Sequence, residues 1–341
     1  MNNGHLNPIA KKLIQQHKKQ DPIPVWARKI KSGLTAALAQ GITLIESNKT
    51  EDHALAILLL NACSAVPKHT TRIGITGPPG VGKSSFIESF GNVILNETQS
   101  KIAVLSIDPS SPLQGGSILG DKTRMQTLAV NQRVFIRPTP SGGDPGGLHK
   151  RTRDCIQLCE FAGYNYIIIE TVGVGQSSFA VNDITDFTVL LIAPGGGDDL
   201  QGIKRGITEL ADLMIVNKND SGMEALASTT QTQYQQAMHL YPGKKINVMK
   251  SSSIHSQGIR EVFHELRQAM EANKKSGSWS RKRRSQVHKS FLNKIGETWQ
   301  NELAKHKNNK RLKAIEAKVI SSPFKSDALA HSYISMLKRL I

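Results

Sequence analysis

The segment 72–85, which reads RIGITGPPGVGKSS, constrains the fold of this chain more than any other. A strand-like apolar pattern precedes its glycines, and apolar residues at helical spacing follow them. Within it, Gly77 is followed after four residues by Gly82-Lys83-Ser84. Glycines in such a loop let backbone N–H groups surround an anion at the N-terminus of a helix. The segment therefore predicts a phosphate-binding loop between a buried strand and a helix.

The side chains of this loop predict a nucleoside triphosphate bound with Mg²⁺. The Lys83 ammonium would reach the β- and γ-phosphates, and the Ser84 hydroxyl would be a ligand of Mg²⁺. A chance match in a glycine-rich turn would not be expected to supply the strand, the glycines, the lysine and the hydroxyl together. The residues expected to contact the phosphates are Gly77, Pro78, Pro79, Gly80, Val81, Gly82, Lys83, Ser84 and Ser85.

Short apolar runs recur along the chain and alternate with segments of helical periodicity. Such runs are typical of strands buried on both faces, and their alternation with helices predicts a parallel sheet. We therefore expect an α/β fold, a doubly wound and mostly parallel sheet of the P-loop type with helical N- and C-terminal extensions. Ligands of such sheets bind at the carboxyl ends of the strands. Beyond the strand before the loop, the expected strands are 102–107, 134–136, 166–169, 189–192, 213–216 and 246–248.

Helices are expected at both ends of the chain. Apolar residues recur at helical spacing over 30–45, and 52–65 predicts a second helix. Near the other end, a helix over 259–272 is followed by a break, and a basic helix begins near Trp279. A last amphipathic helix is expected over 328–341. The helices at the two ends would therefore flank the sheet as extensions.

The net charge of +17 is unevenly distributed. Residues 71–270 carry 18 basic and 18 acidic side chains, whereas 1–70 carry 9 and 4, and 271–341 carry 17 and 5. We therefore expect three parts: an N-terminal helical extension over 1–70, a nucleotide-binding domain over 71–270, and a basic C-terminal helical region over 271–341. A basic tail can bind nucleic acid or an acidic protein, or can be the solvated face of helices.

The basic region also carries an apolar stripe. Val287, Phe291, Ile295 and Trp299 follow one another at steps of four residues, so this helix is expected to bury one face. The aromatic side chains lie on the stripe and are not interleaved with the basic residues. This pattern favours packing against protein over nucleic-acid binding.

Composition bears on the compartment. No apolar run approaches the roughly 20 residues that a bilayer span needs. The N-terminus lacks the pattern of a secretory signal, although its lysines leave an organelle-targeting segment open. The three cysteines, Cys63, Cys155 and Cys159, are too few for a disulfide framework and favour a reducing compartment. We therefore expect a cytoplasmic protein without a membrane span.

Two of the cysteines lie on one face of an expected helix. Cys155 and Cys159 are four residues apart and could form half of a metal site. No second pair of His or Cys residues lies nearby in the sequence to complete one. Their spacing therefore favours small side chains buried in a core.

The tetrapeptide Asn217-Lys218-Asn219-Asp220 follows the expected strand 213–216. A carboxylate there can accept hydrogen bonds from both N1–H and the exocyclic amine of guanine. Adenine offers neither donor on that edge, and binding it would leave a buried polar group unpaired. The motif predicts that Asp220 selects guanine, with Asn217 and Lys218 beside it, so the expected ligands are GTP and GDP.

The tetrapeptide Glu170-Thr171-Val172-Gly173 ends another expected strand. A carboxylate at this position is typically near Mg²⁺, and the Gly173 N–H can meet the γ-phosphate. GTPases usually have Asp here, and the longer Glu could reach the metal through water. Ras-like GTPases place a water-orienting Gln directly after the glycine. Here that position is Val174, and the nearest glutamine is Gln176, so slow intrinsic hydrolysis is expected.

Two further acids are candidates for the Mg²⁺ shell or for positioning the attacking water. Asp108 ends the expected strand 102–107, and Asp121 lies in the glycine-rich segment 115–122. Each is also typical of a helix cap. The segment 195–204 begins with three glycines and is expected to move.

Together these motifs resemble the methylmalonyl-CoA mutase-associated GTPases, the MeaB/ArgK group. The likeness covers about residues 30–300 and includes Arg283-Arg284-Ser285-Gln286. The segments that carry it are the P-loop, 107–111 (IDPSS), 116–125 (GSILGDKTRM), 170–177 (ETVGVGQS), 200–204 (LQGIK) and 217–220 (NKND).

The resemblance implies a homodimeric GTPase chaperone of an adenosylcobalamin-dependent methylmalonyl-CoA mutase, which gates cofactor loading and protects the mutase. It implies that 271–341 is a dimerisation region, that 200–204 responds to the mutase, and that Ser252, Ser253 and Ile254 form the guanine loop. The implied Mg²⁺ ligands are Ser84, Asp108, Asp121 and Glu170. The implied catalytic residues are Lys83, Asp108 and Glu170.

The chain departs from the group at Ser178, where Glu is usual, at Ser253, where Ala is usual, and in the glycine-rich segment 142–147. Three other functions stay open. A kinase of amino-acid-binding transport proteins would more naturally use ATP, which Asp220 disfavours. A nickel-insertion GTPase would usually carry His-rich tracts, whereas the 11 histidines here are scattered. The third is a nucleic-acid-binding protein driven by its basic tail.

Overall fold

The computed structural model divides the chain into two compact units, Met1–Ser280 and Arg281–Ile341. It describes residues 21–64, 70–108, 125–140, 145–171, 181–196, 211–239, 246–306, 309–321 and 326–337.

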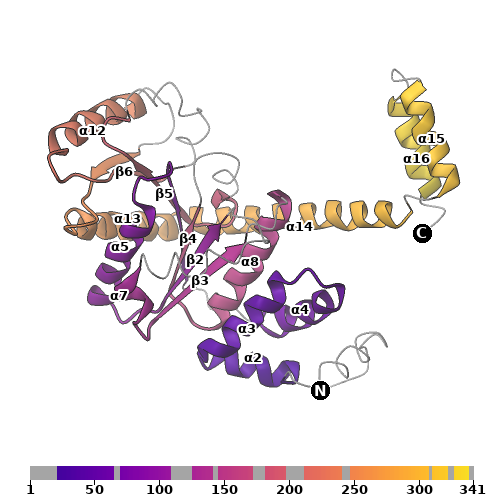
Figure 1. The fold of residues 1–341 in the computed structure, drawn as a ribbon, viewed down its shortest axis with the longest axis horizontal. Helices are drawn as coiled ribbons and strands as arrows, with labels where there is room; N and C mark the ends of the chain where they lie inside the picture. The colour runs from indigo at the N-terminus through magenta and orange to yellow at the C-terminus, as the bar shows by residue number, and fades with distance from the viewer. Residues whose placement is uncertain are drawn as a thin grey trace. The chain divides into compact units, whose positions relative to one another are not determined.

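One parallel sheet is the centre of the first unit (Figure 1). Its described strands are β1 (Thr71–Thr76), β2 (Ile102–Asp108), β3 (Val134–Pro140), β4 (Tyr166–Glu170), β5 (Phe187–Ile192), β6 (Leu213–Val216) and β7 (Asn247–Lys250). They lie side by side in the order β3-β2-β4-β1-β5-β6-β7. The predicted α/β fold is confirmed. From β1 the chain crosses over β4 to form β2, whereas from β4 it crosses over β1 to form β5. The crossover direction therefore reverses between β4 and β1. Parallel sheets bind ligands at the carboxyl ends of the strands at such a reversal point.

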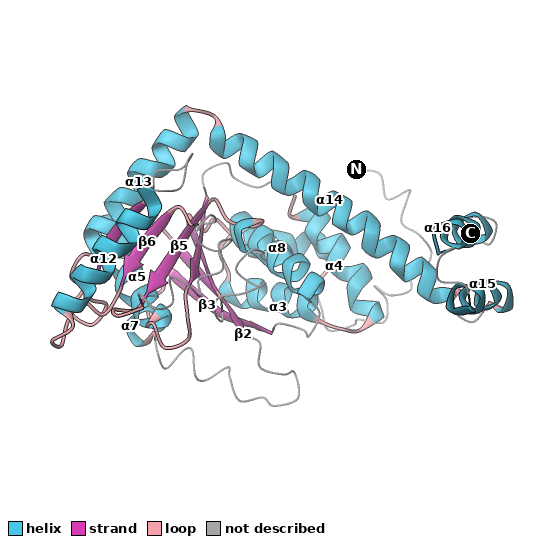
Figure 2. Ribbon diagram, turned by 90° about the horizontal axis from the view of Figure 1, so that it is seen from above, coloured by secondary structure: helices cyan, strands magenta, loops and turns pink. Residues whose placement is uncertain are grey.

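Helices cover both faces of this sheet (Figure 2). Those of the first unit are α2 (Ile23–Lys31), α3 (Thr35–Glu46), α4 (Thr50–Ala62), α5 (Lys83–Glu97), α7 (Gln126–Ala129), α8 (Pro145–Phe161), α12 (Glu224–His239) and α13 (Ile259–Lys275). Successive strand residues point to opposite faces. In β2, Val104 packs with α5, α7 and α13, whereas Leu105 packs with α8 and the helices α2–α4. α12 covers the remaining strands on this second face, against Leu190 and Met214. The result is three layers with the sheet in the middle.

The N-terminal helices differ from the expected single helix over 30–45. The chain turns at Gly33, whose φ of +82° lies in the left-handed region that favours glycine, so α2 and α3 are separate. The Trp26 Nε1–H donates to the Ala37 carbonyl at 2.9 Å and ties the two helices together. Periodicity alone missed this turn because apolar residues continue through it.

A buried ion pair joins β1 to α8. The Arg72 Nε and Nη2 donate to the two carboxylate oxygens of Glu160, each at 2.8 Å. The side chains of Arg72 and Glu160 are only 16% and 2% exposed. Burial and the nearby Arg72 charge lower the pKa of Arg153. Glu160 thus neutralises the Arg72 guanidinium where that group is poorly solvated.

The C-terminal helices are α14 (Ser278–Lys305), α15 (Lys310–Ser321) and α16 (Ser326–Leu337). In the second unit α15 packs against α16, and Leu312 and Leu337 are fully buried. The sequence did not predict α15, and α16 lies within the predicted final helix over most of its length. Among the helices that the structure describes, none combines the length and the apolar character required to cross a membrane.

Candidate nucleotide-binding site

The phosphate-binding loop lies between β1 and α5, as predicted. Gly80 and Gly82 have φ values of +76° and +92°, a conformation that side chains with a Cβ rarely adopt. A Cβ on Gly77 would lie 2.6 Å from the Leu191 carbonyl oxygen of β5, so this glycine is needed for close packing. α5 begins directly after Gly82, and its N-terminal N–H groups therefore face the loop.

The Lys83 ammonium lies over this loop. Its Nζ donates to the carbonyl oxygens of Gly77 at 2.9 Å and Pro78 at 3.0 Å. An ammonium has three N–H donors, so a third remains for a phosphate oxygen. Burial lowers the pKa of Lys83, and the carboxylate of Glu170 partly opposes that effect. The two carbonyl oxygens thus fix the position of the Lys83 ammonium beside the loop.

Three oxygen-bearing side chains meet at the ends of β2, β4 and the start of α5. The Ser84 Oγ–H donates to Glu170 Oε1 at 2.9 Å, and the Ser106 Oγ–H donates to Glu170 Oε2 at 3.1 Å. Ser84 was predicted to be a metal ligand with Glu170 near it, and the fold brings the two together. The sequence did not predict a role for Ser106, although a serine within an otherwise apolar strand could have indicated one. An all-oxygen set with a carboxylate fits the chemistry of Mg²⁺.

The predicted base-binding residues also converge. The Ser252 Oγ–H donates to Asp220 Oδ2, and both side chains are buried. This bond orients a carboxylate that follows β6 and would accept hydrogen bonds from the base. Lys218, with φ +61°, and Ile254, 73% exposed, lie on the outer side of the same loops.

Asn217 has a role that the sequence did not reveal. Its Nδ2 donates to the Val81 carbonyl at 2.9 Å. Its Oδ1 accepts from Ser251 at 3.1 Å and from Ser253 at 2.7 Å. One buried amide therefore connects the phosphate-binding loop to the loop after β7. In the sequence, only the serines at positions 251 and 253 indicated that this loop could make such a contact.

Several predicted residues lie outside the described part of the chain. β2 ends at Asp108, but its side chain is not described. Asp121, Gly173, Val174 and the segment 200–204 are not described at all. The predicted roles of these residues remain predictions. The same is true of Gln176 and Ser178.

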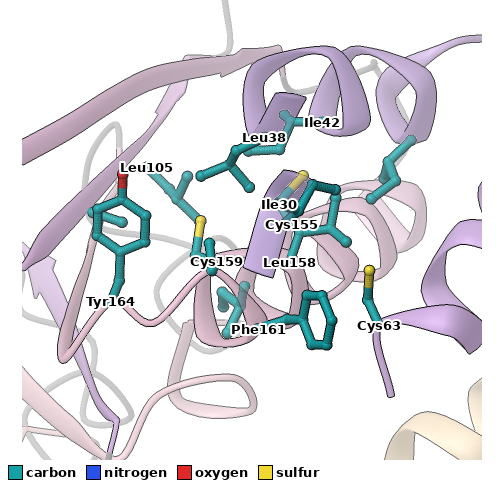
Figure 3. Packing of buried hydrophobic residues seen from close by; sticks show 14 of the residues in the cluster. Ile30, Leu38, Ile42, Cys63, Leu105, Cys155, Leu158, Cys159, Phe161 and Tyr164 are labelled. Carbon is teal, nitrogen blue, oxygen red and sulfur yellow. The ribbon is translucent and has the colours of Figure 1, made fainter. Parts of the chain in front are cut away.

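The cysteines lie in an apolar environment (Figure 3). Cys155 and Cys159 are fully buried among leucine and isoleucine side chains that include Leu158 and Ile30. Burial raises the pKa of both thiols, and it raises that of Cys63 to about 11. Within the described residues, no three His, Cys, Asp or Glu side chains come together as a metal site. The core position favoured from the sequence accounts for this pair.

Comparisons with known proteins agree with this geometry. The family model described as "Methylmalonyl Co-A mutase-associated GTPase MeaB" matches residues 38–310. GTPase ArgK of Escherichia coli is 44% identical over 243 residues, which are 70% of this chain and 73% of that protein. The mouse protein named methylmalonic aciduria type A homolog, mitochondrial, is 43% identical over 274 residues, or 76% of this chain and 66% of its own length. The crystal structure of a protein named LAO/AO transport system kinase superposes with a TM-score of 0.71 at 29% identity, covering 99% of both chains.

The family model spans the phosphate-binding loop, the Glu170 cluster and the base-binding loops, so the match includes the whole candidate site. These residues fit a guanine nucleotide, and both the family and the Escherichia coli relative are named as GTPases. The chain is therefore a P-loop enzyme that binds guanine nucleotide and hydrolyses GTP, and it belongs to the methylmalonyl-CoA mutase-associated GTPase family.

Proposed function

We propose that this protein is the GTP-dependent chaperone of an adenosylcobalamin-dependent acyl-CoA mutase of the methylmalonyl-CoA mutase type, gating cofactor loading and protecting the mutase. The observation that carries the proposal is the family match over residues 38–310, which reaches beyond the nucleotide site into both sets of flanking helices. The family is named for its association with methylmalonyl-CoA mutase, and the mouse relative is named for methylmalonic aciduria. Three free cysteines support a reducing compartment, and we propose the cytoplasm.

In the proposed hydrolysis, water attacks the γ-phosphate in line with the leaving group. Lys83, held by two loop carbonyls, stabilises negative charge on the phosphates, and the N-terminus of α5 adds its aligned N–H groups. Ser84 and Glu170 would hold Mg²⁺, with Asp108 and Asp121 as the further acids proposed from the sequence. When bound, Mg²⁺ would neutralise charge on the β- and γ-phosphates.

Base recognition is proposed to depend on Asp220. Its carboxylate would accept from guanine N1–H and the exocyclic amine, while Ser252 orients it. Ser253 and Ile254 follow in the same loop, and Lys218 and Asn217 flank the base from the end of β6. This arrangement supports GTP over ATP, because adenine has no donor to satisfy the buried carboxylate.

A homodimer formed through α14 is the proposed assembly. Four apolar side chains of this helix are exposed to an unusual degree: Val287 is 68% exposed, Phe291 61%, Leu292 52% and Ile295 50%. Grouped apolar side chains of this kind usually mark an interaction surface. A second copy of the helix offers the same surface by symmetry, and an isologous contact is the commonest form of dimer.

The test is the effect of a methylmalonyl-CoA mutase on GTP hydrolysis. We expect the purified protein alone to turn over GTP slowly, well below the roughly 10 per second of an activated GTPase. Adding the adenosylcobalamin-dependent mutase from the same cell should raise the rate. Calorimetry with the two proteins should show a nucleotide-dependent affinity.

Three results would count against the proposal. The first is a GTP hydrolysis rate that the mutase does not change, together with an affinity for the mutase that the nucleotide does not change. The second is transfer of the γ-phosphate to an amino-acid-binding transport protein, which would favour the kinase function for which the solved relative is named. The third is GTP hydrolysis that the mutase does not stimulate but that nickel and a nickel enzyme together do, which would favour a nickel-insertion GTPase.

A further inference from the structure

A buried hydroxyl on α5 makes a contact with the guanine loop that the nucleotide-binding motifs do not include. Ser89 lies almost two turns after Lys83 and is 8% exposed. Its Oγ–H donates to the carbonyl oxygen of Ser253 at 2.5 Å. We infer that Ser89 is a positioning residue for base recognition, acting through the Ser253–Ile254 peptide, an inference that rests on the proposed guanine site.

The contact closes a ring of bonds around the site. From Val81 in the phosphate-binding loop, the ring passes through the Asn217 amide to the hydroxyl of Ser253. From the Ser253 carbonyl it passes to Ser89 and returns along α5, which begins two residues after Val81. Because all four residues are buried, each bond acts in a low-dielectric environment where an unmade bond is costly. The loop that holds the phosphates and the loop that holds the base are thereby fixed to the same helix.

The geometry of one peptide gives Ser89 its effect. In a trans peptide the C=O and the following N–H point in opposite directions. Ser89 donates to the Ser253 carbonyl from α5, so the N–H of the same peptide, that of Ile254, points away from this helix. In the inferred role, this N–H is the donor to the O6 acceptor of guanine. Adenine has an amino group at that position, which would place donor against donor.

This role separates Ser89 from Asp220. Asp220 would read the N1–H and amine edge of guanine, whereas the Ile254 N–H would read O6. Inosine keeps O6 and N1–H but lacks the exocyclic amine. Loss of the Ser89 hydroxyl should therefore reduce the preference for GDP over ADP and leave the preference for GDP over IDP unchanged.

The experiment measures the affinity of the full chain for GDP, IDP and ADP with Mg²⁺ by calorimetry. In Ser89→Ala we expect the GDP-to-ADP affinity ratio to fall by about tenfold, the scale of one lost buried hydrogen bond. The GDP-to-IDP ratio should stay within about twofold. Ser89→Thr retains the hydroxyl and should restore the GDP-to-ADP ratio.

A matched control separates positioning from general loss of stability. The Thr70 Oγ1–H donates to the Tyr164 carbonyl at 3.0 Å. Thr70 is also buried, and it lies before β1 at the opposite end of the strands. Thr70→Val should lower the midpoint of urea unfolding as Ser89→Ala does, without changing either ratio. Equal changes of the ratios in both variants, or an unchanged GDP-to-ADP ratio in folded Ser89→Ala, would overturn the inference. If the unaltered protein itself bound GDP and ADP equally, the proposed guanine site would fail first.

Discussion

Replacing Asp220 by Asn tests the base site directly. The carboxylate is buried, and Ser252 already donates to one of its oxygens. Each carboxylate oxygen has two acceptor positions, so both can still accept from guanine. An amide at this position has only one acceptor oxygen, and its NH₂ group would face a guanine donor. At least one hydrogen bond is therefore lost, whichever way the amide is turned.

The size of the loss follows from these contacts. A hydrogen bond to a charged group contributes roughly 1.5–3 kcal/mol, and a buried donor left unpaired costs roughly 1–3 kcal/mol. One lost bond and one unpaired donor give roughly 3–6 kcal/mol. Since about 1.4 kcal/mol corresponds to tenfold in affinity, GDP should bind roughly 10²–10⁴-fold more weakly to Asp220→Asn.

The assay is calorimetry of GDP and xanthosine diphosphate with Mg²⁺. Xanthine has a carbonyl where guanine has the amine, so the new NH₂ group can donate to it, and the preference between the two nucleotides should invert. Asp212→Asn is a suitable control because Asp212 accepts from the Thr188 N–H at 2.8 Å, at the amino end of β5. It should bind GDP normally. A folded Asp220→Asn that binds GDP within about threefold of the unaltered protein would refute the assignment.

Three further predictions concern the metal, the core and the assembly. Glu170→Gln should raise the Mg²⁺ concentration needed for half-maximal hydrolysis by about 10–100-fold, the usual effect of a carboxylate that supports a metal ligand, and an unchanged Mg²⁺ titration would contradict this. Glu160→Ala should lower the free energy of urea unfolding by about 3–5 kcal/mol, because it leaves Arg72 buried and unneutralised. The control Asp21→Ala removes the partner of Lys29 in an exposed ion pair and should lower it by less than about 1 kcal/mol. Similar losses in the two variants would refute the role of burial. Phe291→Ser combined with Ile295→Ser on α14 should give a monomer by light scattering with unchanged GDP affinity, and a persisting dimer would exclude this face.

Much of the fold followed from local pattern. Every described strand overlaps a predicted apolar run. The continuous apolar sequence of β5, for example, reflects its burial on both faces. Periodicity was less reliable for helices. It merged α2 with α3 across Gly33, and it missed α15, a short helix rich in lysine whose packing depends mainly on α16. The division into parts at residues 70 and 270 remains a prediction.

The site was predictable where one motif performs one task. The loop from Gly77 to Ser84 can turn into the N-terminus of α5 because Gly80 and Gly82 adopt positive φ values. Glu170 meets Ser84 because parallel strands end at one edge of the sheet. The contacts that the sequence did not predict join residues far apart in the chain. Ser106 meets Glu170 across 64 positions, and Ser89 meets Ser253 across 164. Single serines carry no periodic or motif signal that would reveal such pairs.

The motif Asn217-Lys218-Asn219-Asp220 therefore contains two separate functions. Asp220 is proposed to bind the base, whereas the Asn217 Oδ1 accepts from Ser251 and Ser253 and its Nδ2 donates to Val81. The second amide hydrogen remains for the base, so the same side chain can fix the loops and contact the nucleotide. A change at Asn217 would disturb the phosphate loop and the guanine loop together, whereas a change at Asp220 would act only on the proposed contacts with the base. The hydrogen bonds of this one buried amide would therefore couple phosphate affinity to base selectivity.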